Sequence, residues 1–332
     1  MRVHFGLPAP RLGPAALAIG SFDGVHLGHR AVLDRLLTSA RKEGLTPALI
    51  TFDPHPRCVL DPASCPPMIT TLEERLGLMQ WLGVQDLIVL EFNLALAALS
   101  ADEFMDRLLA AVDLRCLVVG YDFALGRGRE GDVEWLARHG NRAGFRVEVV
   151  PPFRLDGQEV HSSEVRRLLT LGDVEAANRL LGRLFQMTGL VLPGDRVGRE
   201  IGWPTVNLSV AAGKLVPARG IYAGWAGLLA PPAQPSPAGR GEDVNDRPFT
   251  VPTPEWEWRA AISIGYRPTF TSVDLRVEAY LLDFSGDLYQ RRLALQFVAR
   301  LHDELKFPDV GELAQQIARD VEATRRLLDE AR

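Results

Sequence analysis

The sequence predicts an α/β protein in two parts, a doubly wound parallel sheet followed by a smaller antiparallel β-barrel or sandwich. Two observations carry this prediction. From residue 15 to about residue 182, apolar stretches of strand length alternate with segments whose apolar residues recur at helical spacing. After Gly182 the apolar stretches become short and alternating, and Gly and Pro residues separate them. The two parts differ in pattern, so they are not copies of one repeat.

Strands and helices are expected to alternate through the first part. Such alternation implies parallel strands with helices on both faces, and ligands then bind at the carboxyl ends of the strands. Ser100 and Glu103 form a capping box at the start of one helix, and Gly44 suits the end of another. The expected strands are 15–20, 46–52, 86–91, 115–120 and 145–150. The expected helices lie near 27–42, 71–82, 101–112 and 132–143.

The second part is expected to hold antiparallel strands and a last helix at 310–328. A Pro-rich segment near 230–256 interrupts it, and its composition favours a disordered loop inserted between two strands. The change of pattern places the domain boundary at 182/183, so the expected domains are 1–182 and 183–332. The expected strands are 187–192, 221–229, 257–264, 275–284 and 288–298.

Composition narrows the class of protein. A chain of 332 residues suits two domains, and its net charge of −5 argues against a nonspecific nucleic-acid binder. Cys58, Cys65 and Cys116 form no metal-ligand pattern and suggest no disulfide framework. The start lacks the apolar core of a signal peptide, and no apolar run is long enough to span a membrane. We therefore expect a cytoplasmic protein without a nucleic-acid or membrane partner; composition does not indicate its oligomeric state.

The most informative stretch is residues 20–29, Gly-Ser-Phe-Asp-Gly-Val-His-Leu-Gly-His. It joins an expected strand to the start of a helix. Its glycines let the backbone approach a ligand, and the free amides of the helix N-terminus point at an anion. His26 and His29 lie on one face of the first turn, where imidazoles can donate to a phosphate oxygen. The stretch predicts a phosphate site; the alternative is a Gly-rich connection whose histidines only cap the helix or pack.

Three further stretches of the first part are candidates for the same site. Residues 52–56, Phe-Asp-Pro-His-Pro, end the second expected strand and could equally form a rigid turn. Residues 120–132 hold glycines and two arginines that suit a substrate phosphate, unless they are only a solvated loop. Ser162 and Ser163 open an expected helix, and Arg166 follows within one turn. These three can bind a triphosphate, or they can simply provide a helix cap and a surface arginine.

The second part carries a candidate metal and base site. Gly198 and Gly202 belong to a glycine-rich loop that ends in Pro-Thr-Val-Asn. Thr205 and Asn207 supply hard oxygen ligands that suit Mg²⁺ carrying nucleotide phosphates. On an expected strand, Glu278 points away from its apolar neighbours and could accept a hydroxyl proton as a general base. The alternatives are a hairpin loop with a turn-forming Asn and a glutamate that pairs across strands.

Together these motifs resemble the bifunctional prokaryotic riboflavin kinase/FAD synthetase family. They occur in family order, and the resemblance covers nearly the whole chain, from about residue 15 to residue 308. The family implies an N-terminal nucleotidyltransferase domain of the His-x-Gly-His type, then a small antiparallel barrel kinase with a C-terminal helix. The matching stretches are 20–29, 52–56, 120–132, 204–207 and 278–289.

The resemblance implies two reactions that use ATP and Mg²⁺. The barrel would phosphorylate riboflavin to FMN, and the first domain would transfer AMP from ATP to FMN, giving FAD and pyrophosphate. The implied catalytic residues are His26, His29, Arg166 and Glu278, and the implied metal ligands are Thr205 and Asn207. The residues implied at ATP or its phosphates are Gly20, Phe22, Asp23, Gly28, Asp122, Gly126, Ser162, Ser163, Gly198 and Gly202.

Four positions depart from the family pattern, namely His161, Ser263, Gln290 and His302. One alternative is an adenylyltransferase whose barrel only binds flavin. A different class is a flavin-sensing or regulatory protein without turnover. The pair His26 and His29 is intact, and so is the set of Thr205, Asn207 and Glu278. Both favour turnover, with riboflavin, FMN and ATP as small-molecule partners.

Overall fold

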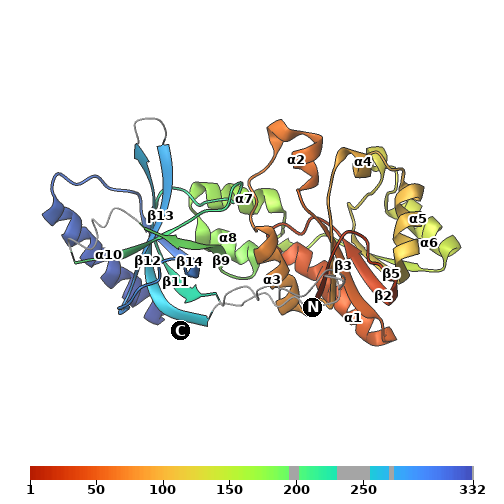
Figure 1. The fold of residues 1–332 in the computed structure, drawn as a ribbon, viewed down its shortest axis with the longest axis horizontal. Helices are drawn as coiled ribbons and strands as arrows, with labels where there is room; N and C mark the ends of the chain where they lie inside the picture. The colour runs from red at the N-terminus through yellow and green to blue at the C-terminus, as the bar shows by residue number, and fades with distance from the viewer. Residues whose placement is uncertain (194–201, 230–254, 269–272, 331–332) are drawn as a thin grey trace, which may run out of the picture. The chain divides into compact units, whose positions relative to one another are not determined.

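The structure is a computed structural model that describes residues 1–193, 202–229, 255–268 and 273–330 (Figure 1). The described residues form two compact units. Met1–Pro66 and Leu72–His161 belong to the first unit, whereas Pro67–Thr71 and the described residues from Ser162 onward belong to the second. The chain therefore enters the second unit twice.

The first unit is built on a six-stranded parallel sheet in the order β1-β4-β3-β2-β5-β6. After β4 the chain returns to the other side of β2, so the strand order reverses between β2 and β5. Ligands of such sheets bind at this point, beyond the carboxyl ends of the strands. The five expected strands are confirmed, and β1 is the strand of this sheet that the sequence did not predict. The strands are β1 (Arg2–Phe5), β2 (Leu12–Ile19), β3 (Thr46–Phe52), β4 (Asp86–Leu90), β5 (Val112–Gly120) and β6 (Arg146–Val150).

Helices cover both faces of this sheet, which confirms the doubly wound prediction. Helices α1 and α3 pack on one face through Leu33, Leu36 and Met79. Helices α5 and α6 pack on the other face through Leu108 and Leu136. The buried residues recur at helical spacing, so one apolar stripe of each helix faces the sheet. These helices are α1 (Leu27–Glu43), α3 (Leu72–Leu82), α5 (Ala101–Ala111) and α6 (Val133–Ala143).

Two predictions about helix ends are also confirmed. The Ser100 hydroxyl accepts from the backbone amide of Glu103, and the Glu103 carboxylate accepts from the amide of Ser100, so the capping box of α5 is formed. Gly44 ends α1 in the left-handed conformation with φ of +65°, which glycine adopts without strain. Short elements of the first unit that were not predicted include α4 (Leu94–Ala97), η2 (Arg127–Arg129), β7 (Arg154–Leu155) and β8 (Gln158–Glu159).

The expectation of no disulfide is wrong, because Cys58 and Cys65 are joined. Cys58 lies on the short helix α2 (Pro56–Leu60), and Cys65 follows the single turn η1 (Pro62–Ser64). These two turns fold the segment back on itself and bring the sulfur atoms together. Cysteine spacing alone does not reveal such a local reversal.

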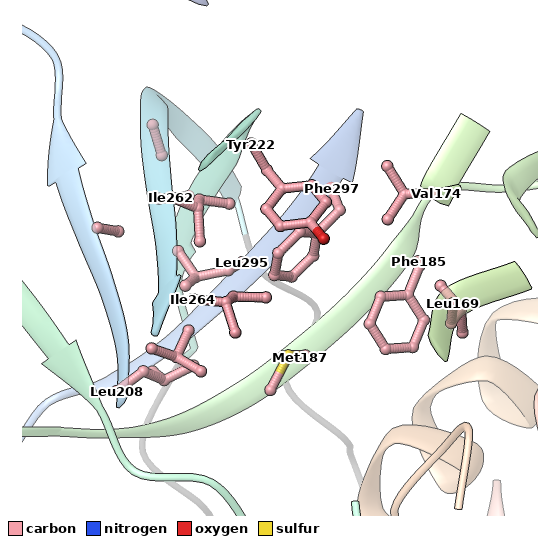
Figure 2. Close-up of a cluster of buried hydrophobic side chains, with 14 of the residues drawn as sticks. Leu169, Val174, Phe185, Met187, Leu208, Tyr222, Ile262, Ile264, Leu295 and Phe297 are labelled. Atoms are coloured by element: carbon pink, nitrogen blue, oxygen red, sulfur yellow. The ribbon is translucent and has the colours of Figure 1, made fainter. Parts of the chain in front are cut away.

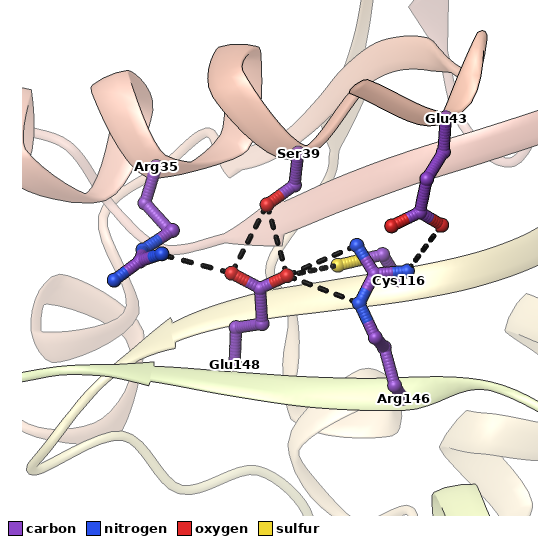
Figure 3. A network of polar contacts seen from close by, with 6 residues as sticks. All are labelled: Arg35, Ser39, Glu43, Cys116, Arg146 and Glu148. Carbon is purple, nitrogen blue, oxygen red and sulfur yellow. Dashed lines mark hydrogen bonds and ion pairs between the residues drawn. The ribbon is translucent and has the colours of Figure 1, made fainter. Parts of the chain in front are cut away.

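A polar network fixes α1 to the sheet beneath it (Figure 3). Glu148 on β6 accepts hydrogen bonds from the Ser39 hydroxyl of α1 at 2.9 and 3.0 Å and from Arg146 Nε at 3.0 Å. Burial acts to raise the pKa of Glu148, but these donors hold that pKa below its ordinary value. Burial and the neighbouring Glu148 carboxylate raise the pKa of the Cys116 thiol to about 12. Cys116 therefore stays protonated and unreactive.

A buried carboxylate holds the unpredicted strand β1 in the sheet. Asp86, at the start of β4, accepts from Arg2 Nε at 2.8 Å and Arg2 Nη2 at 2.7 Å, and it lies 2.9 Å from His4 Nε2. Burial acts to raise the pKa of Asp86, but the contacts with His4 and Arg2 hold it below its ordinary value. Arg2 and His4 are alternate residues of β1, so their side chains lie on the same side of the strand, and their contact with Asp86 stabilises the strand.

The second unit is a closed six-stranded antiparallel barrel in the order β10-β13-β12-β11-β14-β9. The sequence predicted a barrel or a sandwich, and the structure is a barrel. The five expected strands are confirmed with shifted ends. Strand β10 was not among the expected strands, because its residues were interpreted as metal ligands or as part of a hairpin loop. The Pro-rich segment near 230–256 lies almost wholly outside the described residues. The strands are β9 (Phe185–Leu192), β10 (Thr205–Leu208), β11 (Gly220–Leu228), β12 (Glu255–Pro268), β13 (Val273–Leu281) and β14 (Arg292–His302).

Alternating side chains fill the interior of the barrel (Figure 2). Ile262 and Ile264 on β12 and Leu295 and Phe297 on β14 are fully buried. Tyr222 on β11 meets the Phe297 ring edge to face, with ring centroids 5.4 Å apart. Because inward positions alternate with outward ones, the residues between these face away from the core.

Two helices and a short segment complete the same core. Leu169 on α7 (Ser162–Leu171) and Val174 on α8 (Val174–Leu181) are buried in the cluster that contains the barrel residues (Figure 2). Ile69 of the segment Pro67–Thr71 joins this cluster, and Lys214 Nζ donates to its carbonyl oxygen at 2.7 Å. Both helices thus pack with the barrel although they precede the predicted boundary at 182/183, which stays a prediction.

The predicted C-terminal helix is confirmed as α10 (Val310–Glu330). His302 at the end of β14 lies 2.8 Å from Asp320 Oδ1 through Nε2 and 2.7 Å from the Asp303 carbonyl through Nδ1. Burial acts to lower the pKa of His302, but the Asp303 carbonyl and the Asp320 carboxylate raise it above its ordinary value. When protonated, the ring can donate from both nitrogens, and its contact with Asp320 joins α10 to the end of β14. Within the described residues, no helix is both long and apolar enough to cross a membrane.

We expect a fragment of residues 162–332 to be more stable than a fragment of residues 183–332. The shorter fragment lacks α7 and α8, whose buried side chains each contribute about 1.5–3 kcal/mol. Thermal melting followed by circular dichroism should give a midpoint several degrees lower for the shorter fragment. In the longer fragment, Leu169→Ala should also lower the midpoint, whereas Arg167→Ala at an exposed position of the same helix should not. Equal midpoints for the two fragments would place α7 and α8 outside the cooperative unit.

Asp86→Asn should destabilise the first unit most strongly near neutral pH. A carboxyl whose folded-state pKa is depressed stabilises the fold above its unfolded pKa of about 3.9, and this contribution is lost as the pH falls through the folded pKa. The difference in free energy of unfolding between wild type and Asp86→Asn should therefore be about 2 kcal/mol at pH 7 and shrink below pH 4. Urea titrations at pH 7, 5 and 3.5 measure it. Asp113→Asn, at a half-buried carboxylate beside two exposed arginines, is the control, and a pH-independent difference would contradict the assignment.

Candidate active sites

A strained turn joins β2 to α1 at the point where the strand order reverses. Phe22, Gly24 and Val25 have φ values of +49°, +83° and +43°. This left-handed region suits Gly24, but a β-branched residue such as Val25 adopts it only when its surroundings enforce it. Phe22 and Val25 are both buried. Such enforced strain is typical of functional turns, and this one ends at His26.

The two histidines of this turn are brought together as predicted. His26 is buried and caps α1: its Nδ1 accepts from the backbone amide of His29 at 3.3 Å. The two rings stack, with centroids 3.7 Å apart and planes 19° apart. Because Nδ1 of His26 accepts, the proton of its neutral ring lies on Nε2, which makes Nε2 the donor. The cap foreseen in the alternative interpretation is therefore real, and it orients the ring.

Gly20 and Gly28 are closely packed, with little room for a side chain. A side chain on Gly28 would place its Cβ 3.0 Å from the His26 ring and 3.1 Å from the carbonyl oxygen of Val160. On Gly20, the Cβ would lie 3.1 Å from the ring of Phe22. A larger residue at either position would have to displace these neighbours by a few tenths of an ångström. A contact of Gly20, Gly28, Phe22 or the buried Asp23 with ATP stays a prediction.

The stretch 52–56 forms the rigid turn that the sequence left open. His55 caps α2, with its Nδ1 accepting from the backbone amide of Arg57 at 3.2 Å, and Asp53 is exposed. Sequence reasoning missed a residue just behind this turn. Arg75 on α3 is buried and donates to backbone oxygens of both this turn and the turn before α1. Its position on the apolar stripe of α3 was the available signal.

The loop after β5 packs against the start of α5. A Cβ on Gly126 would lie 2.6 Å from the backbone nitrogen of Ala101, and the Glu130 carboxylate accepts from that amide at 2.8 Å. Arg129 Nη2 donates to the carbonyl oxygen of Asp122 at 2.6 Å. These contacts explain the glycine and one of the arginines in structural terms. Phosphate binding by Asp122 and Gly126 stays a prediction.

Ser162 and Ser163 begin α7, as expected, but α7 belongs to the second unit, whereas the stacked histidines belong to the first. Arg166 Nε donates to the carbonyl oxygen of Pro67 at 2.9 Å. His161, a departure from the family pattern, lies with its Nε2 3.3 Å from a carboxylate oxygen of Glu159. A joint role of the α7 residues and the histidines at one site stays a prediction.

Strand pairing in the barrel brings Thr205, Asn207 and Glu278 together. Asn207 on β10 is directly opposite Glu278 on β13, and Thr205 is opposite Tyr280. The Thr205 hydroxyl donates to Glu278 Oε2 at 3.4 Å. Ala279 on β13 points into the core, so all four side chains lie on the outer face of the barrel. This confirms the predicted orientation of Glu278.

The surroundings of Glu278 include two residues that the sequence did not single out. Arg276 on the same strand lies with Nη1 3.7 Å from Glu278 Oε1. The ion pair of the alternative interpretation is thus present, but along one strand rather than across two. The rings of Trp203 and Tyr280 meet edge to face, with their centroids 5.0 Å apart. Gly202 is exposed with φ of +85°, and Gly198 lies outside the described residues.

The donor set on this face suits a hard cation. Within the described parts of the chain, no group of three or more His, Cys, Asp or Glu residues could hold a metal ion by themselves. Thr205, Asn207 and Glu278 instead offer two neutral oxygens and one carboxylate side by side. Mg²⁺ in phosphate-transfer sites is usually held by one or two carboxylates together with substrate phosphates and waters. The residues therefore fit an ion that arrives with a nucleotide.

Comparison with known proteins identifies a family for each part of the chain. The family model described as FAD synthetase matches residues 9–164, and the one described as riboflavin kinase matches residues 181–328. The bifunctional riboflavin kinase/FMN adenylyltransferase of Pseudomonas fluorescens is 35% identical over 93% of this chain and 91% of its own length. The chain belongs to this bifunctional family. The protein of the same name from Bacillus subtilis (strain 168) is 32% identical over 92% of this chain and 90% of its own length.

A solved structure shares the fold over nearly the whole chain. The crystal structure of a protein named macrolide-efflux protein, from Streptococcus pneumoniae, has a TM-score of 0.79 and 27% sequence identity. The likeness covers 96% of this chain and 95% of that one. Both units described above are therefore part of a shared fold.

The structure shows where three of the departures from the family pattern lie. Gln290 has φ of +61°, the left-handed region that glycine favours, and the family pattern has glycine there. Ser263 on β12 is directly opposite Glu278, so it lies beside the candidate base. His302 contacts α10 through Asp320 and therefore has a structural partner within its own unit.

Proposed function

We propose that the chain has both activities of its family, phosphorylation of riboflavin to FMN on the barrel and transfer of AMP from ATP to FMN in the first unit. The observation that carries this proposal is the presence of two complete, separate groups suited to phosphate chemistry. One is the stacked pair His26 and His29; the other is Thr205, Asn207 and Glu278. Matches to both family models favour two activities over an adenylyltransferase whose barrel only binds flavin. Riboflavin, FMN and ATP are the substrates, and we place the enzyme in the cytoplasm.

In AMP transfer, an oxygen of the FMN phosphate attacks the α-phosphorus of ATP. The bond between that phosphorus and the bridging oxygen breaks, and pyrophosphate leaves. The free amides at the start of α1 attract the anion. His26 and His29 donate to phosphate oxygens on which negative charge grows in the transition state. The family pattern adds Ser162, Ser163 and Arg166 as phosphate ligands. No covalent enzyme intermediate forms, so orientation and charge stabilisation supply the catalysis.

In the kinase reaction, Glu278 accepts the proton of the ribityl hydroxyl as its oxygen bonds to the γ-phosphorus of ATP, and ADP leaves. The Thr205 hydroxyl and Arg276 contact the two carboxylate oxygens of Glu278 and hold it in place. Thr205 and Asn207 would hold Mg²⁺, which neutralises charge on the phosphates when it is bound. The outer face of the barrel keeps this chemistry apart from the apolar core.

His29→Ala should slow FAD formation from FMN and ATP by about a hundredfold, the scale of one preorganised donor. FMN formation from riboflavin should be nearly unchanged, because that site lies on the barrel. Chromatography of the flavin products measures both rates in the same protein. His139→Ala is the matched control, because it also removes a stacked ring, on Trp135 in α6, but outside the turn. FAD formation by His29→Ala at the wild-type rate would contradict the assignment.

Glu278→Gln should slow FMN formation by about a hundredfold or more, because glutamine keeps the size of glutamate but cannot accept the proton. Riboflavin binding, measured by fluorescence titration, should persist, and so should FAD synthesis from supplied FMN. Glu257→Gln on the exposed face of β12 is the control and should leave both activities unchanged. Loss of riboflavin binding with turnover kept at saturating substrate would make Glu278 a binding residue instead.

A further inference from the structure

Arg75 is the largest fully buried side chain of the described chain that carries a charge, with 2% of its surface exposed. Burial lowers the pKa of its guanidinium, and the carboxylates of Asp23 and Asp53 act in the opposite direction. Burying such a group costs free energy unless its donors are used. The free energy of burial therefore has to be offset by the contacts that Arg75 makes.

Those contacts join the two turns at the carboxyl ends of β2 and β3. Arg75 Nη1 donates to the carbonyl oxygen of Ser21 at 2.7 Å and lies 3.2 Å from that of Phe52. Arg75 Nη1 also donates to the Thr51 hydroxyl at 2.9 Å, and this hydroxyl donates to the carbonyl oxygen of Ser21 at 3.0 Å. One buried nitrogen thus fixes both strand ends to α3.

The Ser21 end of this network is the start of the strained turn. Phe22 and Val25 hold φ values of +49° and +43°, and such values persist only where the surroundings enforce them. The Ser21 carbonyl, immediately before Phe22, receives two hydrogen bonds from the network. The turn ends at His26, whose ring orients His29. Releasing Ser21 would let the turn relax and move both rings.

We propose that Arg75 is a positioning residue for AMP transfer, which acts through the turn before α1 and does not itself touch ATP. The proposal rests on the proposed function of the histidine pair. A displacement of reacting groups by about 1 Å can cost about a hundredfold in rate. Arg75 therefore governs the rate of FAD formation from a position on α3, behind both turns.

The first test compares variants of the full chain in FAD formation from FMN and ATP. Arg75→Met should lower kcat by about thirtyfold or more with KM values within about threefold, because positioning acts on the transition state. Arg75→Lys should retain more activity than Arg75→Met, because it keeps a donor. Thr51→Val removes only the central hydroxyl and should lower kcat by about threefold to tenfold. FMN formation from riboflavin should be unchanged in all three.

Arg2→Met is the matched control, because Arg2 also binds buried groups of this unit but contacts β4 through Asp86. It should leave kcat within about twofold of wild type. A double-mutant cycle with His29→Ala separates positioning from general stability. In the His29→Ala background, Arg75→Met should lower kcat by a smaller factor than in the wild-type background, because one of the two rings that it positions is already absent. A full additive loss would overturn the proposal, as would equal losses of both activities.

A second readout does not depend on turnover. In protein labelled with ¹⁵N-histidine, the ring signals assigned to His26 and His29 should shift in Arg75→Met and Thr51→Val and stay in place in Arg2→Met. Unchanged histidine signals in Arg75→Met would overturn the positioning role, even if the rate falls. A wild-type protein that makes no FAD from FMN would instead overturn the proposed function, and the histidine signals would still decide what Arg75 holds in place.

Discussion

The turn between β2 and α1 is the constraint on which the first unit is organised. It must place a buried imidazole at the N-terminus of α1 while the backbone passes through left-handed conformations at Phe22 and Val25. Such a turn does not hold itself, because each strained residue costs about 1–3 kcal/mol. The surrounding contacts meet this cost. Arg75 and Thr51 bind the start of the turn, and Glu148 fixes the body of α1 to the sheet. These contacts therefore hold the turn, and with it the histidine pair, in place.

In the barrel, the register of the strands positions the candidate site residues. Thr205, Asn207 and Glu278 come from strands far apart in the chain, and none of them is fully buried. Antiparallel pairing sets Asn207 opposite Glu278, and the two-residue period turns both outward while Ala279 fills the core. A shift of one residue in the register would send the carboxylate into the apolar interior. The apolar core therefore determines the geometry of the polar face.

The packing of α7 and α8 shows that the change of sequence pattern and the change of packing occur at different places. The pattern changes after Gly182, where helical spacing gives way to short strands. Packing changes earlier, because Leu169 and Val174 are buried with the barrel residues. Periodicity reports the type of an element, whereas its neighbours are decided by which apolar surfaces meet in space.

Interactions between residues close together in the sequence were sufficient to predict many elements of this protein. Strand 46–52 was predicted with both ends correct, and so were the capping box at Ser100 and the left-handed end of α1 at Gly44, because each depends on neighbours within a few residues. The junction of a strand, a turn and a helix start at residues 20–29 was predicted for the same reason. Tertiary structure decided the rest. Strand β1 depends on a carboxylate eighty-odd positions away, at Asp86, and β10 on pairing with β13. The role of Arg75 appears only when two strand ends meet behind it. Contacts between residues distant in sequence leave no local pattern, so only the folded chain reveals them.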